Sequence, residues 1–176
     1  MKKIAVDSYY EGDTAYNVGV VFRDLKDSQP LEIIKTETHN LSPYIPGEFY
    51  KRELPGILSI LEKIELPEFD TIILDGFYKL YDGKEIRPGL GMKLEEALGE
   101  HVHSDLSIWC IAKSDFIMTS EISELVRRGK ETKKPLYVQA SRGLVGVLVK
   151  EMHGEHRIPT ILKILDKETK KIRGKG

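Results

Sequence analysis

Residues 71–76 read TIILDG, a short run of apolar and β-branched residues that ends in an acidic residue and a glycine. A continuous apolar run of this length is typical of a strand that is covered on both faces. Asp75 and Gly76 then follow the carboxyl end of the strand. Ligands of open α/β sheets bind outside the carboxyl ends of the strands. The stretch therefore predicts a layered sheet and a place for chemistry beside Asp75.

Two further apolar runs end in charged residues. Residues 4–6 are followed by Asp7, and residues 106–112 are followed by Lys113. We expect strands that end at or near these two residues. Because the carboxyl ends of parallel strands lie at one edge of a sheet, Asp7, Asp75 and Lys113 are expected to lie close together.

The order of elements predicts an α/β fold. The β-prone runs at residues 4–7, 15–23 and 31–38 are separated by turn residues and predict an antiparallel three-strand meander. Later strands alternate with helices, so we expect them to run parallel in a central mixed sheet that helices flank. The later elements are a helix with Pro55 in its first turn that Pro67 stops, helices at residues 92–98, 121–128, 143–153 and 160–165, and strands at 106–112 and 136–139.

Composition bounds the class of protein. The chain has 176 residues, which suits a single domain over residues 1–176, and its 40% hydrophobic and 31% charged residues are ordinary for a soluble protein. The formal charge of -1 excludes a broadly basic surface, so nucleic-acid binding would need a local basic patch. Late basic residues either bind a phosphate backbone or form a solvated face, and the tail at about residues 167–176 is expected to be frayed. These basic residues are Arg127, Arg128, Lys130, Lys133, Lys134, Lys167, Lys170, Lys171, Arg173 and Lys175.

Cysteine usage and apolar pattern indicate the compartment. Cys110 is the one cysteine, which excludes an internal disulfide framework and favours a buried thiol in a cytoplasmic protein. The N-terminal apolar stretch is too short for a signal peptide. No segment approaches the roughly 20 apolar residues of a membrane span. We therefore expect a cytoplasmic monomer that does not contact a membrane.

Three carboxylates are candidates for a magnesium site. Asp7 and Asp75 would lie on neighbouring strands, and Glu53 would reach in from the start of a helix. Hydrolysis of a phosphodiester needs a nucleophilic water and a stabilised leaving oxygen, and Mg²⁺ can supply both. Magnesium prefers oxygen ligands. Lys113 would orient the scissile phosphate or stabilise the developing negative charge.

Each of these residues also has a structural interpretation. Asp7 could end a strand, and Glu53 could stabilise a helix N-terminus through the dipole. Asp75 before Gly76 is ordinary turn chemistry, and Lys113 could lie on the surface. Taken singly, each residue type is more often structural than catalytic.

The loop at residues 43–46 reads PYIP, and its two prolines, Pro43 and Pro46, make it rigid. An exposed Tyr44 beside Ile45 would be an apolar wedge that enters between bases. Alternatively, Tyr44 and Ile45 fill the core beneath the loop. Elsewhere the histidines lack zinc-site spacing, and the sequence has no P-loop, no GxGxxG motif and no GxSxG motif.

These stretches together resemble the endonuclease V family, nucleases of the ribonuclease-H-like fold. The resemblance spans nearly the whole chain and is most specific at YIPG and REL. The stretches that carry it are IAVDSYYEGDTAYNVGVVF (residues 4–22), YIPGEFYKRELPGILSIL (44–61), TIILDGFY (71–78), IWCIAKS (108–114), KPLYVQASRG (134–143) and HRIPTILKILD (156–166).

The resemblance implies an activity and assigns roles. It implies a Mg²⁺-dependent endonuclease, with Mn²⁺ as a substitute, that hydrolyses DNA or RNA on the 3′ side of a deaminated base, inosine, in repair or processing. Asp7, Glu53 and Asp75 match the metal-binding carboxylates, and Lys113 matches the family's lysine. The run Pro43-Tyr44-Ile45-Pro46 matches the wedge, and Gly76 is expected beside the pocket for the altered base.

Departures from the family pattern predict a changed site. The family's P-G-H-R run is here Gln139–Arg142, with Ser141 in place of the histidine, so a ligand or proton-handling side chain is expected to be missing. Phe77 and the segment Ile86–Gly89 replace the family's G-H-G or G-N-G and H-P-R-R residues, so a reshaped base pocket is expected. The departures leave open a nuclease for another modified base, a catalytically weakened nucleic-acid-binding protein, and a structural protein that keeps only the fold.

Overall fold

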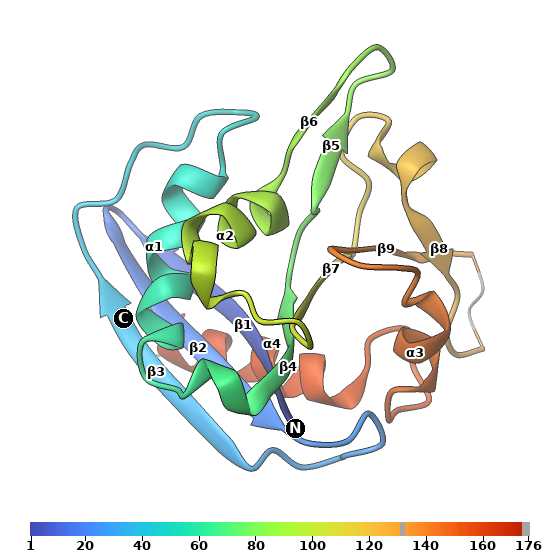
Figure 1. Ribbon diagram of the computed structural model, residues 1–176, viewed down its shortest axis with the longest axis horizontal. Coiled ribbons are helices and arrows are strands. Elements are labelled where there is room, and N and C mark those ends of the chain that lie inside the picture. Colours follow the sequence, from blue (N-terminus) through green and yellow to red (C-terminus); the bar gives the residue numbers. More distant parts are fainter. Residues whose placement is uncertain (131–132, 174–176) are drawn as a thin grey trace.

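The computed structural model describes residues 1–130 and 133–173, and its centre is a seven-stranded mixed sheet (Figure 1). In spatial order the strands are β3 (Glu32–Thr38), β2 (Thr14–Phe22), β1 (Lys2–Glu11), β4 (Phe69–Leu74), β7 (Ser107–Ala112), β9 (Leu136–Ala140) and β8 (Glu124–Val126). The three middle strands, β1, β4 and β7, run parallel. The first three strands of the chain form the predicted antiparallel meander.

Helices cover both faces of the sheet. On one face lie α1 (Tyr50–Leu61) and α2 (Leu90–Leu98), and on the other lie α3 (Gly146–Glu151) and α4 (Thr160–Arg173) (Figure 1). Successive side chains of a strand point to opposite faces, so each middle strand contributes side chains to two hydrophobic cores. In β4, Ile72 and Leu74 pack with α1 and α2, whereas Ile73 packs with α3 and α4. The predicted α/β fold with a mixed sheet between helices is confirmed.

Several details differ from the sequence-based expectations. β9, expected to be parallel, pairs antiparallel with both β7 and β8. Residues 121–128, expected to be a helix, form a 3₁₀ turn at Thr119–Ile122 followed by β8. Part of the glycine-rich segment after β4 forms a hairpin of β5 (Lys79–Tyr81) and β6 (Ile86–Pro88) that projects from the body of the molecule (Figure 1).

The basic tail is mostly ordered. Residues 167–173 of the basic tail, where fraying was expected, belong to α4, which continues to Arg173. Glu168 and Thr169 are buried, and Lys35 of β3 lies 3.0 Å from a Glu168 carboxylate oxygen. These contacts hold the last turns of α4 against the meander, while residues 174–176 lie outside the described residues. Among the described helices, none is long and apolar enough to cross a bilayer.

Candidate active site

The register of the middle strands places Asp7 beside Asp75. Val6 of β1 pairs with Leu74 of β4 in a parallel ladder, so the next residue of each strand lies at the same level of the sheet. β4 ends at Leu74, whereas β1 continues to Glu11 because β2 still pairs with it. Asp75 therefore stands at a strand end, as predicted, but Asp7 lies within a strand, which corrects the prediction that the strand ends near it.

Helix α1 brings the third predicted carboxylate to the same place. Glu53 lies in the first turn of α1 and lines one pocket together with Asp7 and Asp75. The helix begins at Tyr50, earlier than predicted, so Pro55 lies inside the helix and not in its first turn. At Gly56, α1 approaches β2 closely, and a Cβ atom there would overlap the buried Asn17 amide.

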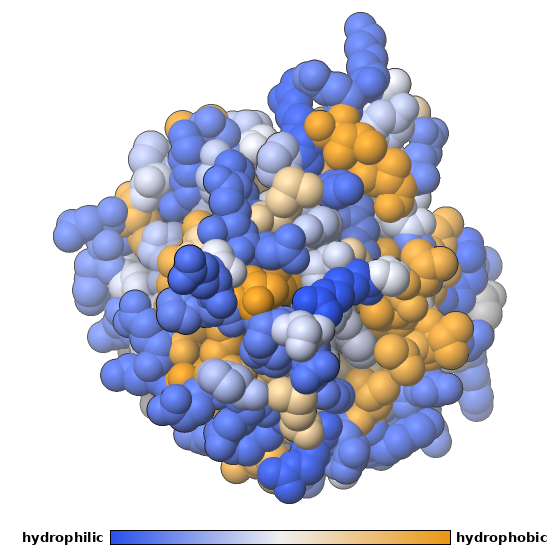
Figure 2. Space-filling model, viewed as in Figure 1, coloured by the Kyte–Doolittle hydropathy of each residue, from blue (hydrophilic) through white to orange (hydrophobic). Residues whose placement is uncertain are grey.

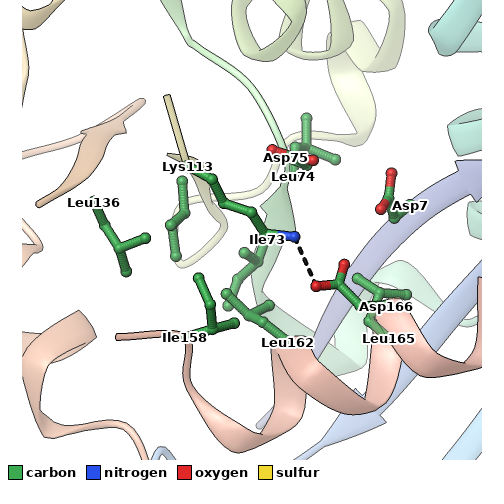
Figure 3. A pocket seen from close by; sticks show the side chains of 11 residues that line it. Asp7, Ile73, Leu74, Asp75, Lys113, Leu136, Ile158, Leu162, Leu165 and Asp166 are labelled. Carbon is green, nitrogen blue, oxygen red and sulfur yellow. Dashed lines mark hydrogen bonds and ion pairs between the residues drawn. The ribbon is translucent and has the colours of Figure 1, made fainter. Parts of the chain in front are cut away.

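A fourth carboxylate, Asp166 of α4, completes the cluster from the other face of the sheet. Asp7, Asp75, Lys113 and Asp166 line one pocket, and the three carboxyl groups stand around a common opening (Figure 3). The Lys113 ammonium lies 2.7 Å from an Asp166 carboxylate oxygen. Asp166 was not among the site residues predicted from the sequence. The available signal was its position four residues after the buried Leu162, where an apolar residue is expected on the core face of a helix.

Crowding of carboxylates changes their protonation. Burial raises the pKa of Asp7 to about 7, and the negative charge of Asp75 adds to this effect. Burial raises the pKa of Glu53 to about 8, with smaller contributions from Asp75 and Asp7. Burial also raises the pKa of Asp75, against the opposing effect of Lys113. Burial lowers the pKa of Lys113, but the hydrogen bond to Asp166 and the surrounding carboxylates raise it more. The cluster thus holds more negative charge than Lys113 offsets.

The chemistry of these donors fits a hard divalent cation. Anionic oxygens without thiolate or imidazole partners are the ligands that Mg²⁺ and Mn²⁺ prefer. A cation among these carboxylates would stabilise the ionised forms of Asp7, Glu53 and Asp75, which burial and the neighbouring negative charges disfavour. Within residues 1–130 and 133–173, no three carboxyl, imidazole or thiol groups stand close enough to hold a metal ion as they are placed. Binding would therefore require these side chains to turn toward the ion.

The PYIP loop displays its apolar side chains. Tyr44 is 67% exposed and Ile45 is 43% exposed, so they do not fill the core, and the core-filling alternative is wrong. The Tyr44 ring stacks on Phe49 with centroids 4.5 Å apart. Arg52 steadies the approach to the loop, because its guanidinium donates to the carbonyl oxygens of Ser42 and Gly12. The loop therefore has the exposure and support that a wedge needs.

A groove of about 520 Å³ joins the loop to the acidic cluster. Glu53 and Asp75 line one part, and Tyr44 lines another. Gly76 lies in its wall with φ +141°, a backbone conformation that favours glycine. Phe77 also lines the groove but is largely buried. The groove has the dimensions of a ligand site and ends at the candidate metal ligands.

The residues that depart from the family pattern at the last strand lie away from the cluster. Ser141 follows Ala140, which pairs with Trp109, and its hydroxyl accepts a hydrogen bond from the Ile108 N–H at 2.9 Å. Ser141 therefore stands beside the start of β7, while Lys113 follows its end, roughly 15 Å away along the strand. Ser141 therefore does not lie among the candidate ligands, where the match to the family's histidine had placed it. The Ser141 hydroxyl instead connects the residue after β9 to the start of β7.

Gln139 has a different part in the site. Its side-chain oxygen accepts hydrogen bonds from the backbone N–H groups of Tyr78 and Lys79, at 2.8 Å and 2.7 Å. Its amide nitrogen donates to the Ser123 hydroxyl at 3.0 Å. Gln139 thus fixes the segment that follows Gly76 and leads into the β5–β6 hairpin.

Two arginines near the site bind backbone rather than solvent. Arg128, counted among candidate phosphate-binding residues, is 4% exposed, and its guanidinium donates to carbonyl oxygens of residues 152–157. Arg157 donates to the carbonyl oxygens of Lys113, Lys134 and Pro135. Arg157 therefore holds the backbone at the end of β7, from which the Lys113 side chain extends toward the carboxylates.

Solved structures share this fold. Endonuclease V of Ciona intestinalis, in complex with a 24mer DNA containing an inosine followed by a ribo-adenosine, superposes with a TM-score of 0.76 at 18% identity, over 99% of this chain and 86% of that one. The catalytic domain of human endonuclease V gives a TM-score of 0.70 at 16% identity, over 99% and 82% of the chains. The resemblance seen in the sequence is thus confirmed at the level of the fold, which is the ribonuclease-H-like fold of endonuclease V.

A smaller structural relative has nearly the same extent as this chain. A protein of unknown function from Archaeoglobus fulgidus gives a TM-score of 0.60 at 13% identity, and the match covers 97% of both chains. No protein-family model and no curated protein sequence matches the chain.

Proposed function

We propose that the chain is a divergent endonuclease of the endonuclease V family. In this proposal it hydrolyses the phosphodiester on the 3′ side of a deaminated base, inosine, in DNA or RNA, as a step of nucleic-acid repair or processing. The observation that carries the proposal is that Asp7 and Asp75 line one pocket with Glu53 and another with Asp166, beside a groove that Glu53 and Asp75 also line. The fold shared with the Ciona intestinalis and human enzymes supports it.

The metal ion in this proposal is Mg²⁺, with Mn²⁺ able to replace it. Asp7, Glu53 and Asp75 would hold it after turning toward it, and Asp166, which lines a pocket together with Asp7 and Asp75, would be a further ligand. When bound, such an ion activates water and stabilises the leaving oxygen of a phosphodiester. The donor chemistry argues for a hard cation rather than zinc, since cysteine and histidine are the usual ligands of structural zinc.

The protein's own groups place the substrate. The Lys113 ammonium, held by Asp166 at 2.7 Å, is positioned to bind the scissile phosphate beside the carboxylates. The exposed Tyr44 ring separates stacked bases, and the displaced base occupies the groove. Gly76 lets that base approach the backbone closely, because no side chain covers it.

A nuclease for a different modified base is the second candidate. Phe77 in the groove wall and the β5–β6 hairpin beside it favour this candidate, since both lie where the base would be read. A catalytically weakened binding protein would keep the groove and the wedge but would not cleave.

One experiment separates these possibilities. The protein is incubated with Mg²⁺ and single-stranded DNA and RNA that carry inosine, other deaminated or modified bases, or unmodified bases. We expect nicks one nucleotide past inosine that Asp75→Asn abolishes. Nicking only at another base would favour the second candidate. Binding without any nicking above the Asp75→Asn variant would contradict the nuclease proposal.

A further inference from the structure

A second cavity lies next to the groove, beside Phe116. It has a volume of about 180 Å³ and lies between the PYIP loop, the β5–β6 hairpin and the loop at residues 114–118. Gly47, Leu80 and Phe116 line both the groove and this cavity. The cavity therefore adjoins the groove that ends at the acidic cluster.

One side of the cavity is the turn at residues 115–118, in which the backbone of Ile117 is strained. Ile117 has φ +56° and is 62% exposed, although a β-branched residue rarely adopts this conformation. Such strain persists only where the surroundings enforce it, and it gathers at functional sites. The turn displays Ile117 and the neighbouring Met118 to solvent.

Several contacts enforce that conformation. The Asp115 carboxylate accepts hydrogen bonds from the N–H groups of Phe116 and Ser120, both at 2.8 Å. The Met118 N–H donates to the carbonyl oxygen of Tyr81 in β5. Met118 also lies on the hairpin turn, where a Cβ atom on Gly83 would stand 2.7 Å from its sulfur. The turn and the hairpin therefore form one rigid wall.

The opposite side is the PYIP loop. Phe49 connects the two sides, because its ring stacks on Tyr44 and meets Phe116 edge-on, with centroids 5.8 Å apart. The PYIP loop contributes Pro46 to the lining of the cavity, and the exposed Tyr44 and Ile45 belong to the same loop. Hydrophobic residues gather beside the hairpin on the space-filling surface (Figure 2).

The charges in the cavity indicate a neutral ligand. Its ionisable lining includes one guanidinium, of Arg87, and two carboxylates, of Asp82 and Glu85. Arg87 pairs with both, at 2.9 Å from Glu85 and 3.6 Å from Asp82. A phosphate would therefore meet a neutralised arginine and an excess of negative charge. A nucleobase, with apolar faces and an edge of donors and acceptors, fits apolar walls with polar groups at one side.

We propose that this cavity binds one unpaired nucleobase of the substrate strand, next to the nucleotide that occupies the groove. The inference rests on the proposed nuclease function, and it names the substrate class as a single-stranded or locally opened nucleic acid. Phe116 and Ile117 supply the apolar surface against which the base stacks. Asp82, Glu85 and Arg87 face the edge of the base. The base must be unstacked from a duplex to enter.

The test uses the full chain in an Asp75→Asn background, so that binding is measured without cleavage. Fluorescence anisotropy follows binding to labelled single strands in which one base at a time is replaced by an abasic site. Stacking of one base contributes about 5- to 100-fold to affinity. We expect one position adjacent to the inosine to show a loss of this size.

Variants connect that position to the cavity. Ile117→Gly removes the apolar side chain at a position where glycine relieves the strain, so the fold should be at least as stable. We expect Ile117→Gly and Phe116→Ala to weaken binding of the intact strand by about 5-fold or more, and to have little further effect on the strand that lacks the adjacent base. Leu144→Ala, at an exposed residue that precedes α3, is the matched control and should leave binding unchanged.

The outcomes separate this proposal from the nuclease proposal. In one outcome the variants weaken binding only when the base at the abasic-sensitive position is present, and the parent protein nicks no substrate. The subsite then stands and the nuclease proposal fails. If the parent protein nicks inosine strands but Ile117→Gly and Phe116→Ala act equally on strands with and without the adjacent base, the subsite is overturned. Absence of single-strand binding by the Asp75→Asn protein would also overturn it.

Discussion

The Lys113 ammonium and the Asp166 carboxylate lie 2.7 Å apart and join the end of β7 to α4 across the candidate active site. Both side chains remain partly open to solvent, at 38% and 26% exposure. A pair of this kind contributes little to stability, about 0–1 kcal/mol. Its position beside Asp7 and Asp75 indicates that it serves the site rather than the fold.

Replacing Asp166 should therefore impair cleavage without unfolding the protein. In Asp166→Asn the lysine loses its ionic partner and the cluster loses a carboxylate, so we expect the cleavage rate to fall at least about 10-fold. The melting temperature should change little. Glu168→Gln is the control, because Glu168 lies on the same helix and pairs with Lys35 and Lys171 outside the cluster. Equal rates for Asp166→Asn and the parent protein would exclude a role for Asp166.

Metal-free protein should lose stability as the pH rises. Burial and mutual repulsion raise the pKa of Asp7 to about 7 and that of Glu53 to about 8. A carboxyl group with a raised folded-state pKa stabilises the fold below its unfolded pKa, near 4, and this contribution is lost as the pH passes the folded value. We expect the melting temperature in EDTA to fall by on the order of 5 °C between pH 5 and pH 8.5.

Added Mg²⁺ should reverse this loss, because a cation binds the ionised carboxylates and competes with protons. The stabilisation by 10 mM Mg²⁺ should therefore be larger at pH 8 than at pH 5.5. The double variant Asp7→Asn with Glu53→Gln should melt with a weaker pH dependence and no response to Mg²⁺. A Mg²⁺ effect that is the same at both pH values, or that survives in the double variant, would be inconsistent with binding at this cluster.

Tyr44 should matter for opened substrates. Its ring is 67% exposed, so Tyr44→Ala should leave the melting temperature within about 1 °C of the parent value. We expect cleavage of an inosine in duplex DNA to fall about 10-fold or more, and cleavage of a single strand to fall less, because a single strand needs no wedge. Tyr44→Phe keeps the ring and should retain most of the activity. A uniform loss on both substrates would argue against the wedge role.

Gly56 should be intolerant of a side chain. A Cβ atom there would overlap the Asn17 amide, which is fully buried and hydrogen-bonded to Ser8, Thr36, Thr38 and Ser59. Gly56→Ala should push α1 away from β2 and destabilise the fold by about 1–3 kcal/mol. Because Glu53 is part of α1, the shift of the helix would displace this carboxylate, and the cleavage rate should fall as well. The measurement is chemical denaturation with a parallel activity assay. Lys51→Ala, on the exposed side of the same helix, should change neither, and an unaffected Gly56→Ala variant would contradict this packing.

The parts of the site that follow from strands were predictable. The unbroken apolar run before Asp75 indicates a strand covered on both faces, and the apolar runs before Asp7 and Lys113 indicate neighbours of the same kind. Parallel packing then brings their ends together. The end of β1 was mispredicted, because Asp7 is followed by Ser8, Tyr9 and Tyr10, whose pairing with β2 depends on a partner elsewhere in the chain.

The parts that depend on long-range packing were not predictable. The spacing of Asp166 from Leu162 is a weak signal, since a carboxylate on a helix is usually a surface residue, and its place in the site follows from the packing of α4 against β1 and β2. The direction of β9 depends on how the chain crosses from β7 through β8, which no local pattern encodes. Ser141 was expected at the site because it matches the histidine of the family's P-G-H-R run, but the antiparallel pairing of β9 carries it to the start of β7, away from Lys113.

Anomalous diffraction from a crystal soaked in Mn²⁺ would locate a divalent cation in the folded protein. A peak within coordinating distance of carboxylate oxygens of Asp7 and Asp75, with Glu53 or Asp166 turned toward it, is the predicted result. The contrary result is Mn²⁺ bound elsewhere, with no metal at these carboxylates at saturating concentration. The acidic residues would then not form a metal site, and the nuclease proposal would be contradicted.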